Sequence, residues 1–134
     1  YPKEKFIKIA NALKKQCLVV WGSDDERKKA EWIEARSKYI KSMPRLNLDE
    51  LKYVVTHSSL LIGNDTGPTH MSWALNIPSI VLFGPTPVER MFQTKTNKAI
   101  KSSSKVNHLK LNKNDYSINE ISVNEIVKIA KQLL

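Results

Sequence analysis

Cysteine, acidic side chains and long apolar runs are all scarce in this sequence of 134 residues. The one cysteine, Cys17, cannot form a disulfide within the chain, which favours a reducing, cytosolic compartment. No apolar run approaches the roughly 20 residues that a membrane-spanning helix needs, and no targeting segment is recognisable. A hydrophobic share of 41% is nevertheless enough for a core. We therefore expect one cytoplasmic domain.

The shortage of acidic residues points to an anionic partner. There are 22 lysines and arginines against 13 aspartates and glutamates, a net charge of +9. RNA-binding aromatic motifs, zinc-finger spacing and a P-loop are absent from the sequence, so nucleic acid is not favoured. A run without acidic residues, Gln93–Asn114, is either a solvated face or a contact with an anionic membrane or phosphorylated acceptor. Its lysines are Lys95, Lys98, Lys101, Lys105, Lys110 and Lys113.

Short apolar runs alternate with amphipathic stretches along the chain. Strands are expected at Cys17–Trp21, Tyr39–Met43, Leu60–Gly63, Ser79–Phe83 and Asn97–Lys101. Helices are expected after Pro2, after the turn Gly22–Glu26 to about Ser37, from the capping box at Asn47 to about Ser58, after Thr66, and after Ser122. This order predicts an α/β fold, a three-layer Rossmann-like domain with a parallel sheet and helices on both sides.

The stretch from Leu60 to Gly84 carries the candidate site. Its polar turn, N-D-T-G-P, follows a strand, and open α/β sheets bind ligands at the carboxyl ends of their strands. Thr66 or Asp65 is expected to cap the following helix, which places backbone amides and the positive helix end near a bound anion. Gly67 permits close approach, and His70 shares a helix face with Thr66.

A structural reading of the same turn stays open. It assigns Asp65 to capping and His70 to covering the core, with Met71, Ala74 and Leu75 as the apolar stripe of the helix. A carboxylate beside a diphosphate would repel it. Asp65 is therefore better suited to accept amide hydrogens, to hold the turn or to bind a sugar hydroxyl.

Several motifs together resemble the bacterial heptosyltransferases of glycosyltransferase family 9, which transfer heptose from ADP-heptose to the lipopolysaccharide inner core. They are N-D-T-G-P-T-H, I-P-S-I-V-L-F-G-P-T, W-G-S-D-D-E and P-R-L-N-L. The resemblance implies a glycosyltransferase B fold with two Rossmann-like domains. Residues 1–134 would form the C-terminal, ADP-heptose-binding half, since the chain opens inside a helix without a methionine. The N-terminal half would hold the acceptor site and the general base.

The resemblance also implies roles for individual residues. Asp65, Thr66, Gly67 and His70 would contact the donor, with His70 stabilising the diphosphate. Glu26 would bind the ribose, with Asp24 or Asp25 as the alternatives if the alignment slips. Leu46 would contact the adenine or belong to the core. Independently of the resemblance, Thr86 and Arg90 follow another strand end, where they could add contacts to an anionic ligand. No metal or other cofactor is expected, and the favoured acceptor is Kdo-lipid A at the cytoplasmic face of the inner membrane.

Two other functions fit parts of the sequence. A non-catalytic sugar-nucleotide or phosphate-binding module would use the same turn without transferring anything. An aspartic protease also carries Asp-Thr-Gly, but it needs two such carboxylates in a β-rich fold. This chain has one copy, followed by a helical pattern.

Overall fold

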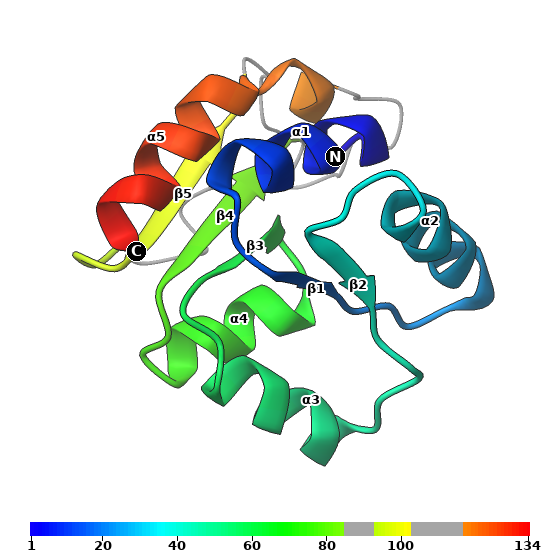
Figure 1. Cartoon of the computed structure of the whole chain (residues 1–134). Helices are drawn as coiled ribbons and strands as arrows, with labels where there is room; N and C mark the ends of the chain where they lie inside the picture. Colours follow the sequence, from blue (N-terminus) through cyan, green and yellow to red (C-terminus); the bar gives the residue numbers. More distant parts are fainter. Residues whose placement is uncertain (85–92, 103–116) are drawn as a thin grey trace.

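The computed structural model describes residues 1–84, 93–102 and 117–134 (Figure 1). The strands and helices follow one another in the predicted order. The elements are α1 (Lys3–Leu13), β1 (Cys17–Val19), α2 (Asp24–Glu34), β2 (Ile40–Ser42), α3 (Leu48–Thr56), β3 (Leu61–Asn64), α4 (Gly67–Ala74), β4 (Ser79–Phe83), β5 (Asn97–Lys101), the short 3-10 helix Ser117–Glu120 and α5 (Val123–Leu133).

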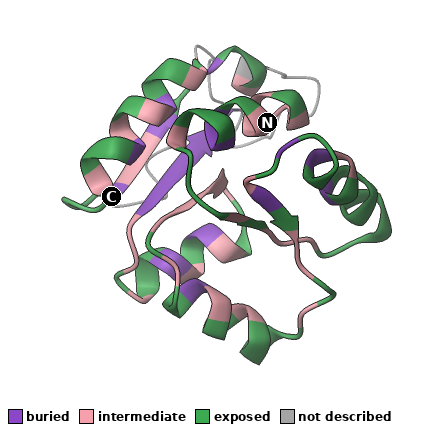
Figure 2. Cartoon of the chain, in the orientation of Figure 1, coloured by how far each residue is buried: buried purple, intermediate pink, exposed green. Residues whose placement is uncertain are grey.

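Every strand pair in the described parts of the chain is parallel. β1 pairs with β2, and β4 lies between β3 and β5. All five residues of β4 are buried, as the continuous apolar run predicts (Figure 2). The short apolar run Leu60–Gly63 likewise predicts a strand buried on both faces, but the residues of β3 are only partly buried. It is an outer strand of its three-stranded sheet and has one hydrogen-bonded neighbour there.

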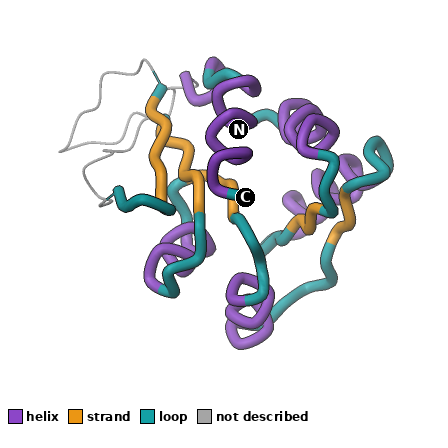
Figure 3. The backbone as a smooth tube through the Cα atoms, turned by 60° about the vertical axis from the view of Figure 1, so that its left-hand side comes forward, coloured by secondary structure: helices purple, strands orange, loops and turns teal. Residues whose placement is uncertain are grey.

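Helices cover both faces of the β3-β4-β5 sheet, which confirms the predicted three layers (Figures 1 and 3). On one face α1 packs against α5, and α5 against β4. On the other face α4 contacts β3 and β4, and α3 packs on α4. The first face forms the main core, which contains Ile9, Ile80, Leu82, Ile100, Ile121, Ile126 and Ala130. No helix in the described ranges is long and apolar enough to span a bilayer.

Helix α4 corrects the sequence prediction about its inner face. Its buried residues are Thr69 and Ser72, whereas Ala74 of the predicted stripe is exposed. The Ser72 hydroxyl donates to the Thr69 carbonyl at 2.7 Å, so this polar group is buried without losing a hydrogen bond. Small side chains let α4 approach β3 closely. A Cβ added to Gly63 would lie only 3.1 Å from Cγ2 of Thr69.

Helix α3 begins with the predicted capping box, but one residue of its predicted apolar face is exposed. The amide of Glu50 donates to Asn47 Oδ1 at 2.8 Å and the amide of Asn47 to Glu50 Oε1 at 2.9 Å, which is the predicted capping box. The spacing of Leu48, Leu51 and Val55 predicts one apolar face for this helix, and Val55 is buried. Leu48, predicted on the same face, is 72% exposed because it is the first helical residue and projects beyond the packed turns.

Candidate functional site

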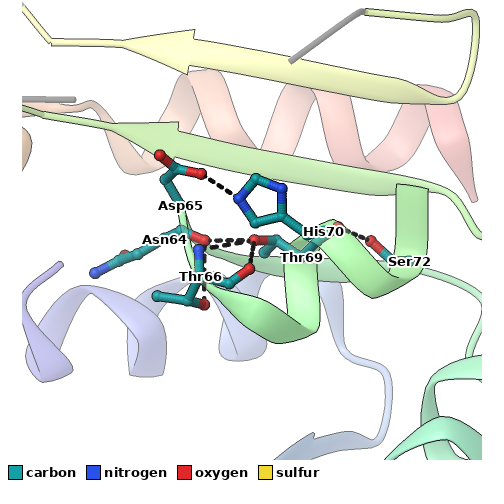
Figure 4. A network of polar contacts seen from close by, with 6 residues as sticks. All are labelled: Asn64, Asp65, Thr66, Thr69, His70 and Ser72. Atoms are coloured by element: carbon teal, nitrogen blue, oxygen red, sulfur yellow. Dashed lines mark hydrogen bonds and ion pairs between the residues drawn. The ribbon is translucent and has the colours of Figure 1, made fainter. Parts of the chain in front are cut away.

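The turn between β3 and α4 is held together by the side chain of Thr69. Its hydroxyl oxygen accepts the amide hydrogen of Thr66 at 3.1 Å and lies 2.7 Å from the carbonyl oxygens of both Asn64 and Thr66 (Figure 4). Thr69 is 2% exposed, so water does not compete for these bonds. Thr66 occupies the N-cap position, one of the two alternatives that the sequence left open.

Asp65 and His70 form a pair across this turn. Oδ1 of Asp65 lies 2.6 Å from Nε2 of His70, and the two side chains point toward each other in Figure 4. The Asp65 side chain is 7% exposed, whereas that of His70 is 53% exposed. His70 therefore does not cover the core, and Asp65 is engaged with a side chain rather than capping the helix. The residues are five positions apart, a spacing that helix-face patterns do not indicate.

One of the expected anion donors is already occupied. The amide of His70 donates to the Thr66 carbonyl at 3.1 Å, as the first hydrogen bond of α4. The open position is Gly67, the first residue of the helix, where an added Cβ would meet no atom within 4 Å. An anion here meets the positive end of the helix, worth about 0.3–1 kcal/mol for one exposed charge.

Glu26 lies in the first turn of α2, which follows β1 after a short loop. Its amide donates to Ser23 Oγ at 3.2 Å, and the Ser23 hydroxyl donates to Glu26 Oε1 at 3.1 Å. Of the two alternative carboxylates, Asp24 forms an exposed ion pair with Arg45 at 3.5 Å. Glu26 is itself exposed and stands beyond the carboxyl end of its strand, the position predicted for a ribose contact.

Leu46 is partly buried in the loop after β2. Sequence reasoning missed two neighbours of this loop. The Trp21 indole donates to the Met43 carbonyl at 2.6 Å, and the Arg45 guanidinium stands 5.1 Å from the centre of the Trp21 ring. Their positions in the sequence could have indicated them, because Trp21 comes two residues after the end of β1 and Arg45 immediately precedes Leu46.

The structure thus brings Asp65, Thr66, Gly67 and His70 into one turn, and it sets Glu26 and Leu46 beyond the ends of two paired parallel strands. Thr86 and Arg90 lie outside the described residues. So do Lys105, Lys110 and Lys113. Lys98 and Lys101 of β5 are three positions apart and therefore point to opposite faces of the sheet. Among the described residues, no three His, Cys, Asp or Glu side chains gather as a metal site.

Comparison with known proteins decides the family. The family model for glycosyltransferase family 9 (heptosyltransferase) matches residues 1–120. The chain belongs to this family. Proteins similar to it include lipopolysaccharide heptosyltransferase 1 of Campylobacter coli, which is 37% identical over 144 residues, covering 99% of this chain and 42% of the relative. The protein of the same name from Salmonella typhimurium is 33% identical over 66 residues, covering 49% of this chain and 21% of the relative.

Solved structures of heptosyltransferases share the fold. Escherichia coli heptosyltransferase WaaC with ADP-2-deoxy-2-fluoro heptose matches at a TM-score of 0.79 and 18% identity, over 100% of this chain and 39% of that one. Escherichia coli ADP-heptose lps heptosyltransferase II matches at a TM-score of 0.75 and 19% identity, over 99% of this chain and 41% of that one. The chain therefore spans about two fifths of the length of these proteins. The aspartic protease alternative is wrong, because Asp-Thr-Gly opens a helix beside parallel strands in a family 9 chain.

Proposed function

We propose that this chain is the donor-binding part of an inverting heptosyltransferase and binds ADP-heptose. The observation that carries the proposal is the rigid turn at Asp65–His70, which leaves open space at Gly67 at the start of α4. Membership of family 9 supports it, as does the similar structure that holds an ADP-heptose analogue. The acceptor site and the general base would lie in another part of the polypeptide, absent from these 134 residues.

In this proposal each residue has a distinct task. The donor diphosphate sits at the start of α4, beside Gly67 and within reach of the half-exposed His70 ring. Glu26 accepts hydrogen bonds from ribose hydroxyls, and Leu46 packs on the base. The charge that develops on the diphosphate is met by the helix end and His70, so no metal ion is required.

The reaction is a single displacement. An acceptor hydroxyl on the lipopolysaccharide inner core, with Kdo-lipid A as the proposed acceptor, attacks the anomeric carbon of the heptose. The bond between that carbon and the diphosphate oxygen breaks, ADP leaves, and the base outside this chain takes the hydroxyl proton. Peripheral contact with the anionic inner membrane through the lysines after Gln93 is part of the proposal.

The decisive variant is Gly67→Ala. Its methyl group meets no protein atom within 4 Å, so the folded chain should be as stable as before, yet the methyl stands where the diphosphate approaches. We expect ADP affinity to fall about tenfold or more, a loss of at least roughly 1.4 kcal/mol of binding free energy. Calorimetry measures the affinity for ADP, and thermal melting measures the stability of the folded chain. Ala74→Ser, exposed at the far end of α4, is the control and should change neither.

Ligand preference tests the rest of the proposal. ADP should bind more tightly than UDP or GDP, and a chelator should leave the affinity unchanged. Tighter binding of UDP, or dependence on a divalent metal, would contradict the assignment. If the chain binds ADP but the complete polypeptide transfers no heptose, the non-catalytic sugar-nucleotide module is the correct function.

A further inference from the structure

We propose that Asp65 is a positioning residue that acts on the donor through His70 and does not contact the donor itself. Resting on the proposed function, this replaces the expectation that Asp65 binds the ligand directly. The first observation is accessibility. The Asp65 side chain is 7% exposed and the His70 ring 53% exposed, so a ligand arriving from solvent meets the ring.

Asp65 and His70 belong to a turn whose backbone is held by other hydrogen bonds. Asp65 lies between Asn64, whose carbonyl is bound by the Thr69 hydroxyl, and Thr66, whose amide donates to the same hydroxyl oxygen. On the other side, the His70 amide donates to the Thr66 carbonyl. Both partners therefore hold their positions without help from the bond between them, and the 2.6 Å contact mainly fixes the orientation of the imidazole ring.

The contact also decides which ring nitrogen faces outward. A carboxylate can only accept a hydrogen bond, so the hydrogen in this contact belongs to Nε2 of His70. Nδ1 is left for the ligand. In the singly protonated ring Nδ1 offers a lone pair, and in the doubly protonated ring it donates N–H to a phosphate oxygen while the ring forms an ion pair with Asp65. The Asp65 charge thus faces the ring rather than the diphosphate.

Kinetics of the complete enzyme separate this role from direct contact. Asp65→Ala should lower kcat about 10- to 100-fold by releasing the ring, with a smaller effect on the KM for ADP-heptose. Asp65→Asn, whose amide oxygen still accepts from Nε2–H, should recover part of kcat. The double variant Asp65→Ala with His70→Ala should be no slower than His70→Ala alone, because Asp65 has nothing left to position. Multiplied losses in the double variant would show direct ligand contact and overturn the proposal.

Nitrogen NMR of the chain tests the orientation without any ligand. The neutral His70 ring should carry its hydrogen on Nε2 almost completely, and in Asp65→Ala it should shift toward the mixture of both tautomers that a free histidine side chain shows. His57 is the internal control, since its Nδ1 lies 2.8 Å from the Tyr53 carbonyl and should carry the hydrogen on the opposite nitrogen. His57→Gln and His70→Gln assign the signals. A His70 ring with its hydrogen on Nδ1 would refute the positioning role even if ADP binds, whereas failure of ADP to bind refutes only the proposed function.

Discussion

Two polar networks stand at opposite ends of the β3-β4-β5 sheet, and they differ in how completely their groups are used. At the amino end, Asn97 is 1% exposed. Its Nδ2 donates to the Ile77 carbonyl and to Ser79 Oγ, both at 2.8 Å, and its Oδ1 accepts from Thr94 Oγ1 at 2.9 Å. At the carboxyl end, Asn64 Oδ1 is buried without a partner, and the ring of His70 in the following helix is half exposed.

This difference in hydrogen bonding distinguishes a network that only stabilises the fold from one that is available to a ligand. Every polar group of the Asn97 side chain is paired inside the protein, so this network can only hold β4 and β5 in register. The hydrogen bonds of the turn at Asp65–His70 fix its own backbone, and the turn leaves a half-exposed imidazole ring and an open helix end toward solvent. A polar cluster that keeps unused groups on a rigid support is the one equipped to bind a ligand.

We expect the largest effect on stability at the Asn97 network, in which every polar group of the side chain is paired. Asn97→Leu keeps the size of the side chain but removes the hydrogen bonds to the Ile77 carbonyl, to Ser79 Oγ and from the Thr94 hydroxyl, at a residue that is 1% exposed. We expect a loss of about 2–4 kcal/mol in the free energy of unfolding. Urea titration followed by circular dichroism measures it. Asn124→Ala on the exposed side of α5 should be nearly neutral, and a neutral Asn97→Leu would show that the network is not structural.

The alternation of elements and the caps could be predicted from the sequence, because they depend on contacts within a few residues. The Asn47 and Glu50 capping box is an example. The Asp65–His70 pair was not predicted, since its partners sit five positions apart on either side of the N-cap, outside the spacings of a regular helix. The buried face of α4 was missed because Thr69 and Ser72 satisfy their hydroxyls locally, and apolar periodicity does not register such residues.

A middle-sized effect is expected at Gly63. The methyl group of Gly63→Ala would lie 3.1 Å from Cγ2 of Thr69 and press β3 away from α4, costing about 1–3 kcal/mol of stability. Gly67→Ala, four residues along the same turn, should cost almost nothing. Thermal melting of Gly63→Ala and Gly67→Ala measures the two losses of stability side by side.

A second substitution identifies the atom responsible. Thr69→Ser removes Cγ2 and keeps the hydroxyl that holds the turn. Adding it to Gly63→Ala should restore part of the lost stability. If the double variant is simply the sum of both losses, the strain at Gly63 does not come from Thr69.

The smallest effect is expected at Asn64, the matched partner of Asn97. Asn64→Leu is the same change in a residue whose Oδ1 has no hydrogen bond to lose, so the free energy of unfolding should shift by less than about 0.5 kcal/mol. The main-chain carbonyl that receives the Thr69 hydroxyl is retained, and the turn should keep its shape. ADP affinity should also be unchanged, because the replaced oxygen is shielded from solvent and from any ligand. A loss comparable to that of Asn97→Leu would mean that Asn64 is as fully bonded as Asn97, and the contrast between the two ends of the sheet would then fail.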